Sequence, residues 1–174
     1  MGFKKLKYTR FSLFARAVES LFSTIMLYGK HPKKPNIVFI WIPKTAGTSI
    51  YTFLNKNLSL LKLNNKKTIY SFPNYGPVTF DHYSYNSLRH AGIVSDRFDD
   101  DSYKFAIARC PYDRAVSLFY YLKQLGKINK DLCFEGFLNL VHKSRPPIGL
   151  YNSTGISQAN PQCDWLIDND NGII

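Results

Sequence analysis

Residues 43–49, Pro-Lys-Thr-Ala-Gly-Thr-Ser, bring a cation, a glycine and three hydroxyl groups together in one short segment. Lys44 supplies positive charge, and Gly47 allows the backbone to approach a ligand closely. If a helix starts here, its unpaired N–H groups and the positive end of its dipole strengthen the attraction. The segment therefore predicts a site for a phosphate-like anion, the alternative being a helix start that binds no ligand. It does not match the P-loop pattern GxxxxGK[ST], because Lys44 precedes the glycine.

The elements around this segment are typical of an alternating α/β chain. Residues 36–42 form a short apolar, β-branched run that predicts a strand buried on both faces, and residues 48–58 can continue as a helix. A second pair has the same order, with a strand over residues 103–109 and a helix that Pro111 opens and that ends near residue 125. Ligands of parallel sheets lie beyond the carboxyl ends of the strands, so both strand-to-helix junctions are expected binding positions. Residues 66–101 are expected to be rich in turns, and residues 131–142 to form a helix.

The composition indicates one folded domain with an anionic partner. The chain has 174 residues, of which 45% are hydrophobic, and it includes 13 Phe and 12 Tyr, which excludes a disordered or low-complexity protein. A formal net charge of +11 favours nucleic acid, a membrane surface, a nucleotide or a sulfated glycan. Residues 1–34 hold eight basic side chains and one acidic side chain, so most of this charge lies outside the folded domain and does not favour nucleic-acid binding by it. The cysteine and histidine spacings match no zinc site, and we expect no metal.

Residues 1–35 are expected to form a basic helical extension and linker, followed by the catalytic domain over residues 36–174. Apolar side chains recur at three- and four-residue steps over residues 11–28, which is the period of an amphipathic helix. Arg16 and Glu19 interrupt the run, whereas a membrane-spanning helix needs about 20 apolar residues. Two interpretations stay open: the helix packs on the domain, or it lies on an anionic membrane as a peripheral contact. An atypical membrane anchor is a weaker third.

Both junctions resemble segments of one known family. Residues 39–49 are similar to the 5′-phosphosulfate-binding segment of the sulfotransferases that include Golgi carbohydrate (heparan and chondroitin) sulfotransferases and bacterial relatives. Residues 105–117 resemble the 3′-phosphate-binding segment of that family, in which an arginine ends a strand and a serine follows eight residues later. The resemblance implies a three-layer α/β fold like that of P-loop kinases, with a central parallel sheet, and 3′-phosphoadenosine 5′-phosphosulfate (PAPS) as co-substrate. It assigns donor binding to Lys44, Thr45, Ala46, Gly47, Thr48, Ser49, Arg109 and Ser117.

The same resemblance implies a catalytic base. His82 lies in a His-x-x-Tyr segment comparable to the one in which the family carries its candidate base histidine. An imidazole, whose ordinary pKa is about 6.5, suits proton removal from a hydroxyl group at neutral pH. His90 and Asp81 are weaker alternatives. Lys44 is the second catalytic candidate, because it would steady the charge on the leaving phosphate oxygen.

Three further interpretations concern the second half of the chain. Arg114 is expected either to support the 3′-phosphate or to pair with an acidic neighbour, and residues 99–101 to form a solvated turn. Residues 162–166, Gln-Cys-Asp-Trp-Leu, are similar to the family's Q-x-x-W-L stretch. In the family another strand and further residues follow that stretch, which implies that a chain ending at Ile174 is truncated.

These observations favour a PAPS-dependent sulfotransferase that acts on a carbohydrate hydroxyl group without a metal. A nucleotide or small-molecule kinase is the alternative enzyme, since strand-loop-helix phosphate sites are common to both classes. A catalytically silent module that binds a membrane or a polyanion is the alternative outside enzymes. The expected location is the Golgi membrane in a eukaryote, and the cytoplasm or a membrane surface in a bacterium.

Overall fold

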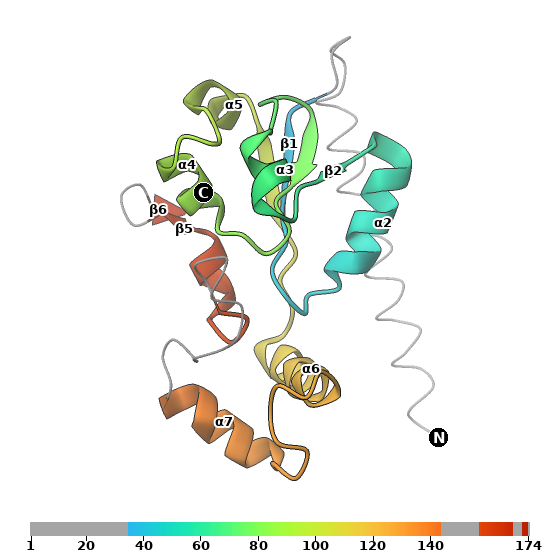
Figure 1. Ribbon diagram of the computed structural model, residues 1–174, viewed down its shortest axis with the longest axis vertical. Coiled ribbons are helices and arrows are strands. Elements are labelled where there is room, and N and C mark those ends of the chain that lie inside the picture. The colour runs from blue at the N-terminus through green and yellow to red at the C-terminus, as the bar shows by residue number, and fades with distance from the viewer. Residues whose placement is uncertain (1–34, 144–156, 169–171, 174) are drawn as a thin grey trace. The chain divides into compact units, whose positions relative to one another are not determined.

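The computed structural model describes residues 35–143, 157–168 and 172–173, which form a mixed α/β structure around a parallel sheet (Figure 1). The extension over residues 1–34 lies outside the described residues, so its helix, the domain boundary after residue 35 and its membrane contact stay predictions. Within the described ranges, no helix is long and apolar enough to cross a membrane. The elements in chain order are β1 (Ile37–Ile40), α2 (Gly47–Leu58), β2 (Leu61–Lys62), α3 (Lys66–Tyr70), β3 (Pro77–Thr79), α4 (Tyr85–His90), α5 (Asp96–Asp100), β4 (Tyr103–Ala106), α6 (Pro111–Gln124), α7 (Phe134–Lys143), a 3₁₀ helix (Gln162–Trp165), β5 (Ile167–Asp168) and β6 (Gly172–Ile173).

The main sheet has the strand order β2-β3-β1-β4, and each neighbouring pair of strands is parallel. All four residues of β1 are buried, which accounts for its continuous apolar sequence. Ile40 pairs with Ala106, so β1 and β4 end side by side at the same edge. Both strands are shorter than predicted, because the chain leaves the sheet after these two residues. The predicted α/β class with a central parallel sheet is confirmed.

Helices flank the sheet on both sides. Figure 1 shows α2 on one side of the sheet and α4 and α5 on the opposite side. Val38 and Ile40 belong to the main apolar cluster, which includes Ile69 of α3, Leu88 of α4 and Phe98 of α5. Successive side chains of a strand point to opposite faces, so the other residues of β1 face away from this cluster. The central strand is therefore covered on both faces, as its sequence predicts.

The prediction of a turn-rich stretch over residues 66–101 is wrong for much of that stretch, which contains three helices and β3. The helices have only five or six residues, too few to repeat an apolar period. Each begins at a polar side chain that accepts a hydrogen bond from a backbone N–H of the first turn. These caps are Asn65, Ser84 and Ser95.

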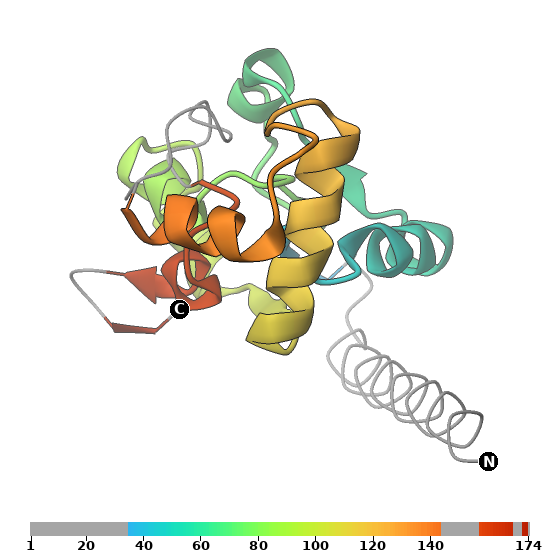
Figure 2. The ribbon, with the colours of Figure 1, turned by 90° about the horizontal axis from the view of Figure 1, so that it is seen from below.

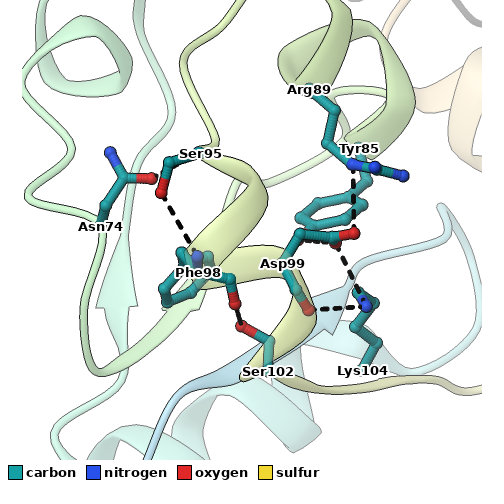
Figure 3. Close-up of polar contacts among 8 residues, drawn as sticks. All are labelled: Asn74, Tyr85, Arg89, Ser95, Phe98, Asp99, Ser102 and Lys104. Atoms are coloured by element: carbon teal, nitrogen blue, oxygen red, sulfur yellow. Dashed lines mark hydrogen bonds and ion pairs between the residues drawn. The ribbon is translucent and has the colours of Figure 1, made fainter.

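The prediction that residues 99–101 form a solvated turn is wrong for Asp99, which is buried in α5 (Figure 3). The Tyr85 hydroxyl donates to Asp99 Oδ1 at 2.7 Å, Lys104 Nζ lies 3.2 Å from the same oxygen, and Arg89 Nε lies 3.2 Å from Oδ2. Burial, together with the hydrogen bond to Asp99, raises the pKa of Tyr85, so the hydroxyl keeps its proton. The carboxylate thus joins α4, α5 and β4 below the surface.

Helices α6 and α7 lie next to each other (Figure 2). A second apolar cluster packs them together. The ring centroid of Phe119 on α6 lies 5.4 Å from that of Phe137 and 5.5 Å from that of Phe134 on α7. The predicted helix over residues 131–142 is confirmed, with its start three residues later than expected. After α7 the described chain resumes with residues 157–161 and the 3₁₀ helix Gln162–Trp165, whose Trp165 side chain enters the main apolar cluster.

Candidate functional site

The carboxyl edge of the sheet gathers three junctions from different parts of the sequence. β1 leads into residues 41–46 and α2, β4 leads into residues 107–110 and α6, and β3 leads into residues 80–84 and α4. β1 lies between β3 and β4, so these three junctions are neighbours. Ligands of parallel sheets bind at this edge. The topology thus brings the predicted residues of both anion segments close to His82.

A cavity of about 290 Å3 opens at this edge and holds most of the predicted site residues. We expected one anion site at each junction, whereas both junctions line this single cavity. Thr45 and Ser49 are not in its lining. The lining residues are Trp41, Pro43, Lys44, Ala46, Gly47, Thr48, His82, Arg109, Ser117, Tyr121 and Gln158.

The loop before α2 has a strained backbone. Lys44 and Ala46 both have left-handed φ angles, 66° and 65°, which residues with side chains rarely adopt. Ala46 is the N-cap of α2 and makes no side-chain hydrogen bond to the helix. By contrast, polar side chains cap α3, α4 and α5. The start of α2 therefore lacks the side-chain cap that the shorter helices have, as an anion-binding helix terminus requires.

Thr45 supports this loop from within. Its side chain is buried, and its hydroxyl donates to the carbonyl oxygen of Ile42 at 2.8 Å. Ser49 lies in the first turn of α2, where its backbone N–H donates to the Ala46 carbonyl oxygen at 3.0 Å. Both residues were predicted to bind the donor. Neither lines the cavity, so their part in donor binding stays a prediction.

Gly47 is required by a neighbouring side chain. A β-carbon added at this position would lie 1.8 Å from Nε1 of Trp41, far inside the contact distance. The indole thus occupies the space that a larger residue would need. The sequence predicted that this glycine would let a ligand approach. Gly47 lines the cavity, and the side on which a β-carbon would lie is filled by Trp41.

Lys44 lines the cavity, and its pKa is lowered. Burial and, second, the positive charge of Arg109 lower the pKa of its ammonium group below the ordinary 10.5. Its Nζ lies 4.0 Å from the centroid of the Tyr121 ring, in a cation–π contact. Tyr121 was not predicted as a site residue, although it follows Ser117 by four residues and so shares its face of α6. An anion in the cavity would relieve the repulsion between Lys44 and Arg109.

Arg109 reaches the first loop from the second junction. Its Nη1 donates to the Lys44 carbonyl oxygen at 3.4 Å, a long bond, and the rest of its side chain is exposed. Ser117 lines the same cavity from α6. The two residues assigned to a 3′-phosphate are therefore adjacent to the loop assigned to a 5′-phosphosulfate.

His82 is oriented by the chain around it. Its Nδ1 lies 2.9 Å from the carbonyl oxygen of Trp41, and a carbonyl can only accept, so Nδ1 carries the proton and Nε2 has the lone pair in the neutral ring. Nε2 lies 3.9 Å from Asp81 Oδ1, and Asp81 also lies 3.5 Å from Lys62 Nζ. The Trp41 ring meets the imidazole edge-on at 5.5 Å. This arrangement suits a base next to a charge that can stabilise its protonated form. His90, the alternative base on α4, is not part of the cavity lining.

Arg114 lies inside the fold, where the carboxylate of Asp164 acts on its charge, as the predicted acidic neighbour would, and where its hydrogen bonds go to the backbone. Its guanidinium is buried and donates to three backbone carbonyl oxygens: Nε to Pro43 at 3.0 Å, Nη1 to Asn160 at 2.9 Å and Nη2 to Gln158 at 2.6 Å. Arg114 thus ties the first loop to residues 158–160. Beside it, the buried side-chain oxygen of Gln158 has no hydrogen-bond partner among the described residues.

Comparison with known proteins gives one family. Residues 31–163 match the model of the sulfotransferase family. A search of curated proteins and a search of solved structures found no match. The matched region spans the parallel sheet, both strand-to-helix junctions and every residue that lines the cavity. The chain therefore belongs to the sulfotransferase family.

Proposed function

We propose that this sulfotransferase takes the sulfuryl group from PAPS and transfers it to a hydroxyl group of a carbohydrate. The observation that carries the proposal is the cavity in which Lys44 and Arg109 lie with the hydroxyl residues Thr48 and Ser117. Two cations and two hydroxyl groups suit a ligand with two anionic groups, and PAPS carries such groups at its 3′ and 5′ positions. The carbohydrate acceptor rests on the resemblance of residues 39–49 and 105–117 to the segments of carbohydrate sulfotransferases.

The residues of the cavity divide into two binding roles. Lys44, Thr48 and the first N–H groups of α2 bind the 5′-phosphosulfate, and Arg109 and Ser117 bind the 3′-phosphate. When bound, PAPS supplies a sulfuryl group that is joined to its phosphate through a bridging oxygen. Lys44 stabilises the negative charge that develops on that oxygen as the bond to sulfur breaks.

His82 acts as the base. Because Nδ1 donates to the Trp41 carbonyl, Nε2 accepts the proton of the acceptor hydroxyl while the hydroxyl oxygen forms its bond to sulfur. The Asp81 carboxylate, 3.9 Å from Nε2, stabilises the imidazolium that results. The products are the sulfated carbohydrate and 3′-phosphoadenosine 5′-phosphate (PAP), and the proton then leaves His82 for water.

Thermal shift titrations with PAP and with ATP, each with and without magnesium, test the donor. Selective stabilisation by PAP supports the proposal, since a ligand stabilises the state to which it binds. Stabilisation by magnesium-ATP alone would favour a kinase, and no stabilisation by either would favour a silent binding module.

Lys44→Ala and Arg109→Ala should each weaken PAP binding about tenfold to a hundredfold, because a charge-assisted hydrogen bond contributes roughly 1.5–3 kcal/mol. Lys127→Ala, an exposed lysine after α6, is the matched control and should bind normally.

Binding and turnover should separate at His82. His82→Ala should keep PAP affinity within a few-fold and lose about 10²–10⁴ in turnover with PAPS and a screened carbohydrate acceptor. His90→Ala, a histidine outside the cavity lining, is the control and should keep its turnover. A loss of turnover in the control but not at His82 would contradict the assignment of the base.

A further inference from the structure

Gln162 binds the peptide backbone of Arg109 with both ends of its carboxamide. The backbone N–H of Arg109 donates to Gln162 Oε1 at 2.9 Å, and Gln162 Nε2 donates to the Arg109 carbonyl oxygen at 2.7 Å. The two residues are 53 positions apart in the sequence. A carboxamide offers one acceptor and one donor side, and here each meets its complement on a single residue. This pairing fixes both the position and the orientation of the Arg109 backbone.

In the part of the chain that the structure describes, little else holds Arg109 in this orientation. β4 ends at Ala106, so Arg109 lies beyond the sheet ladder. Its guanidinium makes one long bond, 3.4 Å from Nη1 to the Lys44 carbonyl oxygen, and the side chain is exposed. Arginine side chains have many rotamers. The region that the charge can reach therefore depends on where the backbone places the Cα–Cβ bond. The two hydrogen bonds with Gln162 fix the position of this bond.

Gln162 can do this because its own segment is anchored. The buried guanidinium of Arg114 donates to the carbonyl oxygens of Gln158 and Asn160, just before it. After it, Trp165 is buried in the main apolar cluster. Gln162 therefore starts a short 3₁₀ helix with fixed contacts on both sides.

We propose that Gln162 is a positioning residue that holds Arg109 where it binds the anionic end of the donor, without touching the donor itself. The inference rests on the proposed function in one respect, that Arg109 binds an anionic group of the ligand. Preorganising a cation before the ligand arrives raises affinity, because less conformational entropy is lost on binding.

A double-mutant cycle on the full chain tests this role, with PAP affinity measured by calorimetry. Gln162→Met keeps the length of the side chain and removes both bonds, and we expect PAP binding to weaken about threefold to tenfold. Arg109→Ala should weaken binding more strongly, and the double variant should bind no more weakly than Arg109→Ala, within about twofold. Such non-additivity is expected for residues that act through one another. Gln124→Met, at the exposed end of α6, is the control and should bind as the unmodified chain does.

Two other results would overturn the inference. Equal PAP affinity of Gln162→Met and the unmodified chain would mean that Gln162 does not position Arg109. Additive losses in the double variant would mean that Gln162 acts independently of Arg109, by contacting the ligand or by supporting the fold in general. Gln162→Asn retains the carboxamide but is one methylene group too short to bring it to the Arg109 backbone, so a folded Gln162→Asn with full affinity would also overturn the inference. If the unmodified chain does not bind PAP, the proposed function fails as well, whereas the other results leave it intact.

Discussion

Arg114→Met removes three buried hydrogen bonds at once while it keeps most of the side-chain volume. In the folded chain the residue is 7% exposed, and its guanidinium donates to the carbonyl oxygens of Pro43, Gln158 and Asn160 at 2.6–3.0 Å. Methionine fills the space but donates nothing. The three carbonyl oxygens then lose their partner in a region from which water is largely excluded. Both the loop before α2 and the segment before the 3₁₀ helix lose their common anchor.

The size of the effect follows from two opposing contributions. Each hydrogen bond from a charged group contributes roughly 1.5–3 kcal/mol, which sets an upper bound of about 5–9 kcal/mol for three. Moving a guanidinium out of water offsets part of this, and the lowered pKa of Arg114 has that burial as its main cause. We therefore expect Arg114→Met to lower the free energy of unfolding by about 3–5 kcal/mol, the usual cost of breaking a buried charged network. For a chain of this size the unfolding temperature should fall by about 6–20 °C.

Thermal and urea unfolding, followed by circular dichroism, measure this loss. Arg97→Met, an exposed arginine on α5, is the control and should unfold within about 2 °C of the unmodified chain. Arg114→Lys should lie between the two, because one ammonium group cannot reach three carbonyls on different segments as a planar guanidinium does. An Arg114→Met variant that unfolds within about 3 °C of the unmodified chain would refute the reasoning, since it would mean that the three bonds contribute no net stability.

Two predictions concern the first loop. PAP affinity should fall as the pH rises through the lowered pKa of Lys44: an anion favours the charged ammonium, so binding takes up a proton where the free site has lost it. Calorimetry across the alkaline range below pH 10.5 should show this fall in affinity. A Lys44→Arg variant, whose guanidinium keeps its charge, should bind PAP with little change over the same range. An equally steep fall in both proteins would contradict the assignment to Lys44. Gly47→Ala should lower stability by about 1–3 kcal/mol and weaken PAP binding, since its methyl group displaces the Trp41 ring. Ala115→Gly on α6 is a control for helix propensity, and normal PAP binding by Gly47→Ala would refute the role given to the indole contact.

The sequence predicted the parts of the fold that a continuous pattern encodes. The buried run of β1 and the proline at the start of α6 indicated these elements directly. Helices α3, α4 and α5 were missed because five or six residues cannot show a helical period. Asp99 was assigned to the surface because three successive aspartates are typical of a solvated turn. Its burial depends on Arg89 and Lys104, which come from α4 and β4 and give no local signal.

The candidate site divides in the same way. Lys44 and Arg109 lie in the loops after β1 and β4, so topology alone predicted that they would lie at one edge of the sheet. Tyr121 could have been predicted, because it shares a helix face with Ser117. The resemblance singled out the segment of Gln162, but its contact with Arg109 could not be predicted, since it joins residues 53 positions apart. The residues that position the site thus escaped sequence reasoning more often than those expected to bind the ligand.

The positioning residues explain how a strained loop can persist before a ligand is bound. Three consecutive carbonyl oxygens of the loop each accept a side-chain hydrogen bond: Ile42 from Thr45, Pro43 from Arg114 and Lys44 from Arg109. Left-handed backbone angles at residues with side chains cost about 1–3 kcal/mol each and persist only where surrounding contacts determine them. Because Arg114 is bonded to the segment before Gln162, and Gln162 to Arg109, the contacts that hold the loop and those that hold the second cation form one connected set. A change in any member of this set should therefore alter PAP affinity through Lys44 and Arg109 together.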